Sequence, residues 1–295
     1  MPRDPFAPAG PRPAEPPTPL SKPRHAFGIP PVSAALLGLI VLLCLLCPLF
    51  LPGDPAYMDL AHCSVPPCPQ FWFGTDTMGR DIFAMIWYGG RTSLLIGFAS
   101  AGISAAAAIL YGTLSGLAPV WLDDLLTRLA ELLLSIPSLL LIVLLQAVWG
   151  KAGPASISLA IGLTSWTGIA RVVRTQVRRL RTSAFVEASW CMGGRFFHIL
   201  RFHLAPNLLS PILFMVVMNI RGAIAAESTL SFMGVGLPLE TVSWGSMLSL
   251  AQSALLGGAW WMVLIPGVFL VATLLCATQI GSGLRAAANQ KLSNL

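Results

Sequence analysis

The densest group of charged residues in this chain lies in one polar segment of its second half. Seven arginines and a single acid, Glu187, fall between Arg171 and Arg201. Small and helix-breaking residues follow that acid at definite spacings: Ala188, Ser189, Gly193 and Pro206. The side chains of Ala188 and Ser189 are small enough to dock closely into a cleft of a partner protein. The residue types therefore indicate a binding surface.

The same segment has the pattern of a helix–turn–helix. Thr182 or Ser183 can cap a helix, and a carboxylate in the early turns, such as Glu187, is favoured by the helix dipole. Glycines at 193–194 break that helix, and a second short helix can run through 196–203. Pro206 ends that second helix or starts the next apolar run. Such an element can transmit a rigid-body movement; the alternative is an ordinary basic helix at the membrane interface.

Motifs that would make the chain an enzyme are missing from its sequence. It has no glycine-rich loop ending in GK[ST], so we do not expect it to hydrolyse ATP. It has no HExxH and no GxSxG, and we find no convincing pair of catalytic acids. His198 and His203 are five residues apart and do not share a helix face, so a metal pair there is not expected. We therefore predict no catalytic residues and no bound metal.

Composition points to a membrane protein. The chain is 55% hydrophobic and 10% charged, and its mean hydropathy is +0.75. Soluble domains usually contain about 25% charged residues. The net charge of +6 is concentrated in one basic loop, which is a positive-inside signal rather than a nucleic-acid surface.

The apolar runs predict six membrane-spanning helices, because about 20 apolar residues cross a bilayer. They cover residues 33–51, 92–117, 125–149, 155–172, 208–232 and 262–282. The proline-rich residues 1–31 predict a disordered cytoplasmic tail rather than a cleavable signal peptide. With that tail inside, the loops at 118–124 and 173–207 and the tail at 286–295 are inside, while those at 52–91, around Lys151 and at 233–261 are outside. The most basic loop thus falls in the cytoplasm.

The first external loop carries charged residues and glycines at turn positions. Asp76, Arg80 and Asp81, with Arg91 further on, can form a small charge network, and Gly79 allows a turn with positive φ. No nucleophile–base pair accompanies them, so an elbow that orients the second span is the simpler reading. In the same loop Cys63 and Cys68 favour a local disulfide; a soft-metal site with His62 is the alternative.

Charged residues inside the spans are further candidates, since a central charge there costs roughly 2.5–3.5 kcal/mol. Arg128 and Glu131 are three apart and can pair along one helix face. Arg221 and Glu227 lie in the fifth span and face partly different directions, so either can line a translocation path or have its own partner. Pro137 predicts a kink in the third span.

Several motifs in order resemble the dipeptide/oligopeptide/nickel family of ABC importer permeases, specifically the C-type subunit. They are the GTDxxGRD-like run at 74–81, LSIPSL at 134–139, the "EAA" loop at 187–206, ESTLSFMGVG at 227–236, WG at 244–245, WW at 260–261, PG at 266–267 and GSGLR at 281–285. The resemblance covers nearly all of the chain beyond residue 33. Ser189, Ala205, Ser243 and Ala286 depart from the family pattern, and the missing acids near 281–286 put a charge-pair role of that terminus in doubt.

This resemblance implies an all-α, six-span permease of a type I ABC importer in the inner membrane of a bacterium. Residues 32–91 would form the first helix and external loop, and 92–285 the permease core, with the coupling loop at about 182–207. It implies a B-type permease, two ATPase subunits, an extracytoplasmic solute-binding protein and membrane lipid as partners, with no nucleic acid. ATP and Mg would bind to the ATPases, and no cofactor to this chain.

The substrate stays open at this point. Peptides are the first choice, and nickel or a metal chelate is the alternative. A secondary transporter that works without ATP is the alternative of another class; it predicts inverted repeats and an ion site at the membrane midplane, neither of which is clear in the sequence.

Overall fold

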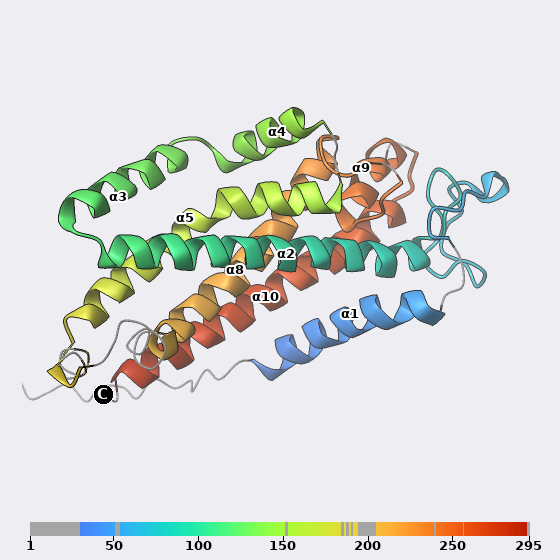
Figure 1. Cartoon of the computed structure of the whole chain (residues 1–295). Helices are drawn as coiled ribbons and strands as arrows, with labels where there is room; N and C mark the ends of the chain where they lie inside the picture. Colours follow the sequence, from blue (N-terminus) through green and yellow to red (C-terminus); the bar gives the residue numbers. More distant parts are fainter. Residues whose placement is uncertain are drawn as a thin grey trace, which may run out of the picture.

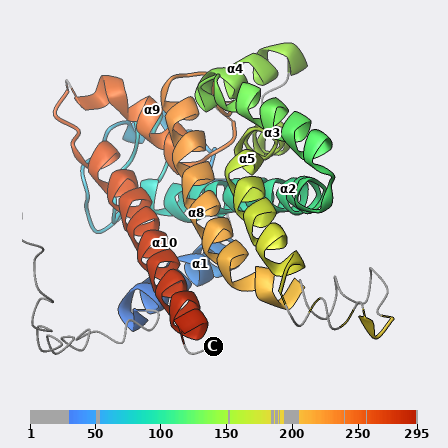
Figure 2. The same ribbon diagram turned by 90° about the vertical axis from the view of Figure 1, so that its left-hand side faces the viewer.

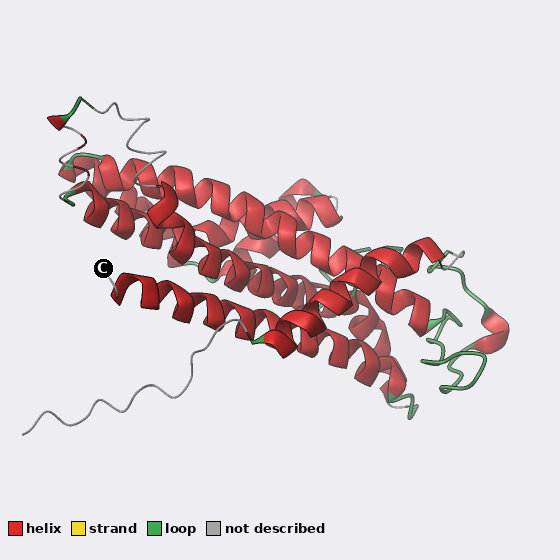
Figure 3. Ribbon diagram, turned by 90° about the horizontal axis from the view of Figure 1, so that it is seen from below, coloured by secondary structure: helices red, strands yellow, loops and turns green. Residues whose placement is uncertain are grey.

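The protein is built from helices that run side by side (Figures 1 and 3). A computed structural model describes residues 30–50, 54–150, 153–183, 186, 189, 191–193, 205–238, 240–255 and 257–293. Within these residues there is no strand, only an isolated bridge between Thr75 and Asp81. The all-α prediction is therefore confirmed. The predicted disordered tail at 1–31 lies outside the described residues except for Pro30 and Pro31.

The elements in chain order are α1 (Pro31–Phe50), the 3-10 helix η1 (Leu60–His62), α2 (Ile82–Leu117), α3 (Val120–Leu134), α4 (Ser138–Trp149), α5 (Pro154–Arg181), α8 (Ala205–Phe232), α9 (Trp244–Leu255) and α10 (Trp261–Ser293). In the described part of the chain, five helices are each long and apolar enough to cross a membrane. The pair α3 and α4 supplies a sixth span if it crosses as one unit. This agrees with the six predicted spans.

The second helix is longer than predicted. It begins at Ile82, whereas the apolar pattern placed the span at 92–117 and left the preceding residues in the loop. The carboxylate of Asp81 caps the helix by accepting the backbone N–H of Phe83 at 3.0 Å. Gly89 and Gly90 then face Ser243 and Trp244 closely. Polar and glycine residues continue this helix because its first three turns pack against protein rather than lipid.

The third span is broken where Pro137 predicted a bend. Helices α3 and α4 meet at an angle of 83°, around Pro137 at the start of α4. Proline has no backbone N–H and its ring clashes with the preceding turn, so the helical ladder cannot continue through this point. The predicted kink is confirmed, and its size makes the span two separate helices.

Two further boundaries differ from the prediction. Helix α5 ends at Arg181, although the apolar run ends near residue 172, because arginine is a good helix former and the helix continues past the apolar zone. The predicted external loop at 233–261 contains α9. Ser243 and Ser246 cap α9 reciprocally, since each hydroxyl accepts the other's backbone N–H, at 3.0 and 2.8 Å.

Helices α2 and α5 pack backbone to backbone through glycines. A Cβ at Gly112 would lie 2.6 Å from the carbonyl oxygen of Ala170 and 2.8 Å from Cβ of Val173. A Cβ at Gly116 would lie 2.9 Å from Val177. The two helices therefore form a close pair in which one cannot shift without the other.

We expect Gly112→Ala to destabilise the protein, because the new methyl group meets a backbone oxygen that cannot turn away. Overpacking of this kind costs about 1–3 kcal/mol. Gly102→Ala is the matched control in the same helix, since no atom lies within 4 Å of its Cβ position. Thermal unfolding of both variants in detergent micelles checks the prediction. An unchanged melting temperature for Gly112→Ala would show that the helices separate easily.

The helix ends gather at two opposite ends of the bundle (Figure 1). One end holds the first turns of α3 and α8 and the last turns of α2, α5 and α10. We call it the basic end, because its arginines include Arg174, Arg178, Arg179, Arg181 and Arg285. The opposite end, which we call the loop end, holds residues 54–81 and α9. Helices α8 and α10 lie side by side between the two ends (Figure 2). This division matches the predicted alternation of loops.

Candidate functional site

The predicted coupling segment at 182–207 is described only in part. Glu187 and Ala188 lie outside the described residues, whereas Ser189 is buried. Val186 is also buried and belongs to the apolar cluster formed with α5 and α8, which includes Ile169. Val186, near the start of the segment, therefore packs against the helices that precede and follow it.

Two predicted features of this segment are visible in its backbone. Gly193 has φ of +80°, a left-handed conformation that favours glycine, as expected for a turn residue. The second short helix predicted at 196–203 lies outside the described residues. Pro206 lies in the first turn of α8, so it starts the next span. Thr182 and Ser183 follow the last residue of α5, and the hydroxyl of Ser183 donates to the carbonyl of Leu180 at 2.5 Å.

A buried carboxylate lies where the basic end joins α3. Asp123 is 1% exposed and accepts two hydrogen bonds from Arg174, at 2.5 Å from Nε and 2.6 Å from Nη2. Arg178 lies 2.9 Å from the same carboxylate, and the hydroxyl of Ser115 donates to it at 2.6 Å. No sequence motif singled out Asp123. Asp123 forms an acidic pair with Asp124 in the turn at 118–124, which was predicted to lie on the same side of the membrane as the arginine-rich loop.

The predicted pair of Arg128 and Glu131 is not formed. Neither residue takes part in an ion pair within 4.0 Å in the described structure. Both residues are exposed, and Glu131 also borders a cavity between α2, α3 and α5 that Arg128 does not line. Spacing of three residues permits such a pair, but here the two side chains do not meet.

The external elbow forms around a buried ion pair. Asp76 and Arg80 are both buried, and Nη2 of Arg80 lies 2.6 Å from Oδ2 of Asp76. The other carboxylate oxygen of Asp76 accepts the backbone N–H groups of Met78 and Arg80, both at 2.8 Å. Gly79 has φ of +76° and completes the turn. Asp76, Gly79 and Arg80 thus lie together in one compact turn, and their role as an elbow that orients α2 stays a prediction.

The elbow ends directly on the cap of α2. Burial raises the pKa of Asp81 above its ordinary value, and the backbone N–H groups of Phe83 and Ala84 partly offset that effect. Arg91, by contrast, is exposed on α2 and forms no ion pair in the described structure. Arg91 does not join the predicted network because α2 begins at Ile82, ten residues before the predicted span at 92–117. Arg91 therefore lies within this helix, away from the turn.

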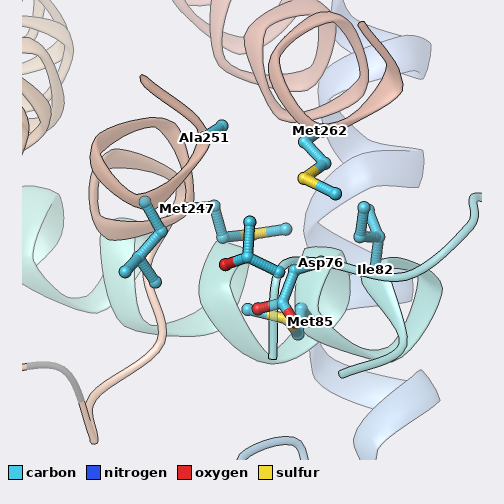
Figure 4. Close-up of a pocket in the computed structure, with 8 residues that line it drawn as sticks. Asp76, Ile82, Met85, Met247, Ala251 and Met262 are labelled. Atoms are coloured by element: carbon cyan, nitrogen blue, oxygen red, sulfur yellow. The ribbon is translucent and has the colours of Figure 1, made fainter. Parts of the chain in front are cut away.

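A small pocket lies beside the elbow, between α2, α9 and α10 (Figure 4). Three methionines line it, one from each helix: Met85, Met247 and Met262. Asp76 also borders the pocket, but its carboxylate is already held by Arg80. Within the described residues no group of three His, Cys, Asp or Glu side chains could hold a metal. The pocket is thus an apolar gap that separates the elbow from α9.

The favoured disulfide between Cys63 and Cys68 is not formed in this structure, in which both are free thiols. Sγ of Cys63 lies 3.4 Å from the carbonyl of Leu60. Nδ1 of His62 lies 2.7 Å from Oδ2 of Asp59, and this hydrogen bond lowers the pKa of Asp59. His62 is therefore turned toward a carboxylate of its own turn, which leaves the alternative of a soft-metal site with the cysteines without support.

Glu227 is enclosed by serine hydroxyls. Its side chain is fully buried, and Oε1 accepts from Ser243 at 2.7 Å and from Ser231 at 2.9 Å. Oε2 accepts from Ser93 at 3.2 Å and lies 3.5 Å from the hydroxyl of Ser228. These serines come from α2, from α8 and from the cap of α9. Glu227 therefore joins three elements at the loop end.

Arg221 lies two turns before Glu227 on α8, and its position differs from that of the glutamate. It is half-buried, and its Nε has no hydrogen-bond partner in the described structure. A role of Arg221 or Glu227 along a translocation path stays a prediction. The full enclosure of Glu227 within this chain favours the structural role.

Comparison with known proteins agrees with this architecture. Residues 108–285 match the model of the family described as "Binding-protein-dependent transport system inner membrane component". The dipeptide transport system permease protein DppC of Bacillus subtilis is 35% identical over 88% of this chain and 82% of its own length. The oligopeptide permease OppC of the same organism is 35% identical over 88% of this chain and 85% of its own. OppC of Haemophilus influenzae is 35% identical over 88% of this chain and 83% of its own length.

The matched region runs from the last third of α2 to residue 285 within α10 and includes the segment 182–207. It covers more than half of the chain, and the relatives extend the match over most of the remainder. The family match, the apolar spans and the helical bundle thus agree with one another. The chain belongs to the family of binding-protein-dependent transport system inner membrane components.

Proposed function

We propose that this chain is the C-type permease subunit of an ATP-driven importer for peptides. As a family member it is a multi-pass inner membrane component and not itself an enzyme. The observation that carries the proposal is the 35% identity over 88% of the chain to permeases named for dipeptide and oligopeptide transport. A Brucella suis relative named as a putative peptide permease is 37% identical over 85% of the chain and supports the same substrate class.

The family description implies an extracytoplasmic binding protein and an ATPase as partners. We further propose a B-type permease and two ATPase subunits, with ATP and Mg bound by the ATPases and no cofactor by this chain. Exposed apolar side chains on α3 and α4 support a second permease or lipid as neighbour. Leu132 is 65% exposed, Leu140 63% and Val148 73%. Such faces are unstable in water and need an apolar covering.

Coupling is assigned to the segment 182–207. ATPases that close on ATP would move this segment, and the bundle would follow as a rigid body. The burial of Val186 and Ser189 supports this assignment, because a segment anchored on α5 and α8 transmits a displacement instead of absorbing it. Substrate would then pass between the two permeases by alternating access, without any chemical step.

Nickel or a metal chelate is the weaker substrate proposal. The relatives compared above are named for peptides, and the described residues around His62 hold no metal-binding group of three. A secondary transporter that works without ATP is disfavoured by the family match, whose description includes a binding protein.

Affinity purification in mild detergent, with mass spectrometry of the bound proteins, tests the assembly. We expect a second six-span permease and an ATPase to be recovered with this chain. In Glu187→Arg the ATPase should be lost while the second permease stays bound, because truncating or reversing a charge in a buried interface costs roughly 2–5 kcal/mol. That penalty corresponds to about 30-fold weaker binding or more, and uptake of a labelled tripeptide should fall accordingly.

Glu240→Arg is the matched control, since Glu240 is exposed at the loop end and should leave ATPase recovery unchanged. Recovery of the chain alone, together with uptake into liposomes without ATP, would contradict the proposed function. Equal recovery of the ATPase by both variants would contradict the assignment of the coupling segment.

A further inference from the structure

We infer that Asp123 is a positioning residue that transmits the movement of α5 to the broken third span during transport, an inference that rests on the proposed function. The carboxylate lies in the first turn of α3 and is held by residues from two other helices. Arg174 and Arg178 come from α5, and Ser115 comes from the last turn of α2. We call these four residues the Asp123 clamp.

The Asp123 clamp is strong because both oxygens of the carboxylate accept hydrogen bonds. Arg174 binds both oxygens through Nε and Nη2, at 2.5 and 2.6 Å, which is the bidentate geometry that makes an arginine–carboxylate pair rigid. Arg178 adds a contact at 2.9 Å to Oδ2, and Ser115 donates to Oδ1 at 2.6 Å. A buried carboxylate with this many donors stays in one position.

The rest of α3 is attached far less firmly. Of the fifteen residues in this helix, all of which the structure describes, only Asp123 is buried. Leu125, Leu129 and Leu133 are 49%, 48% and 43% exposed. Beyond the clamp, a cavity of about 290 Å³ lies between α3 and the helices α2 and α5. Movement of α3 with α5 therefore depends on its first two turns, which hold the clamp and a hydrogen bond from the hydroxyl of Tyr111 on α2 to the carbonyl of Leu126.

The two helices that the Asp123 clamp joins, α5 and α3, are both suited to transmitting movement. On one side α5 ends at Arg181 and continues directly into the segment 182–207, which docks on the ATPase under the proposed function. On the other side the break at Pro137 separates α3 from α4 by 83°, so α3 can change its angle without carrying α4 with it. Helix α2 supports the clamp because its glycines hold it close to α5.

A displacement of the coupling segment would thus shift the last turns of α5, and the clamp would make α3 follow. The same four residues could also do no more than hold the fold together. The two roles differ in what happens when the charge is removed. A transmission element loses transport per ATP hydrolysed, whereas a purely structural pair lowers the amount of folded complex and leaves that ratio unchanged.

The test uses the full complex of this chain with its partner permease, ATPases and binding protein, reconstituted in liposomes. Asp123→Asn removes the charge and keeps the shape. Asp124→Asn is the matched control, because Asp124 is the adjacent acid on the same helix and is exposed. Uptake of a labelled tripeptide and ATP hydrolysis are measured on the same vesicles. We expect uptake per ATP to fall about tenfold in Asp123→Asn, within the 5–150-fold span typical of coupling between sites, and to stay unchanged in Asp124→Asn.

A distance measurement provides a readout that does not depend on transport. Spin labels at Leu129 on α3 and Thr175 on α5, both exposed, should give one narrow distance distribution with and without ATP. In Asp123→Asn that distribution should broaden. If Asp123→Asn fails to assemble, Arg178→Gln replaces it, since the side chain of Arg178 is 44% exposed and its loss leaves both bonds to Arg174 in place; a smaller fall in uptake per ATP is then expected.

A distribution as narrow as that of the wild type, or an unchanged ratio of uptake to ATP hydrolysis, would overturn the role of Asp123. Failure of the wild-type complex to take up the tripeptide is a separate result. It would overturn the proposed function, while the spin-label distances would still show whether α3 and α5 move as one unit.

Discussion

Replacing Gly79 by alanine should unfold the external elbow and lower the melting temperature of the protein by more than 5 °C, at roughly 2–4 °C per kcal/mol. A Cβ at this position would lie 1.8 Å from the carbonyl oxygen of Asp59, a distance that no rearrangement of side chains can relieve. The residue also has φ of +76°, which costs about 1–2 kcal/mol for a residue with a side chain. Thermal unfolding in detergent micelles measures the effect.

Gly150→Ala separates the two contributions. Gly150 ends α4 with φ of +66°, and no atom lies within 4 Å of its Cβ position. Gly150→Ala therefore has the unfavourable positive φ without a steric clash. The melting temperature of this variant should fall by less than that of Gly79→Ala. If Gly79→Ala and Gly150→Ala lowered stability equally, the close contact with Asp59 would play no part, and the elbow would be looser than the structure indicates.

Replacing Glu227 by leucine should release α9 from the bundle. The substitution leaves the hydroxyls of Ser93, Ser231 and Ser243 without their common acceptor, and each buried polar group without a partner costs about 1–3 kcal/mol. Ser243 is also the cap of α9, so the loss reaches that helix first. Hydrogen exchange of the α9 amides should become faster, and the melting temperature should fall.

The loss of stability in Glu227→Gln should be intermediate. Its amide oxygen still accepts from two serine hydroxyls, whereas its NH₂ group faces hydroxyls that donate to the carboxylate in the wild type. Glu240→Gln is the control, since Glu240 is exposed and lies at the same end of the molecule. Unchanged exchange in α9 for Glu227→Leu would show that apolar packing around Trp244 holds this helix without the carboxylate.

Much of the fold could be predicted from local pattern. Apolar runs of sufficient length indicated six spans, because a bilayer requires about 20 such residues for each helix. Pro137 indicated the break in the third span, since proline cannot continue the helical ladder. Asp76, Gly79 and Arg80 indicated the elbow because the contacts of the Asp76 carboxylate, with Met78 and Arg80, lie within four residues of sequence. Each of these features depends on neighbours in the chain.

Helix boundaries were predicted less well, for a physical reason. The apolar pattern reports where a helix meets lipid, not where its backbone ladder ends. Helix α2 begins ten residues before the apolar run and α5 continues nine residues beyond it, because the additional turns pack against protein or extend past the bilayer. Helix α9 was missed because its twelve residues are interrupted by serines and a glutamine and are too few to span a bilayer.

The sequence alone determined that this is an apolar, multi-span helical protein with one strongly basic loop, and its ordered motifs indicated the permease family. Only the tertiary structure decided which polar residues meet. Asp123 and Arg174 are 51 residues apart, and Ser93 and Glu227 are 134 apart. Such contacts depend on how far one helix is shifted and rotated against another, and that register follows from the close fit of glycines such as Gly112 against the neighbouring backbone.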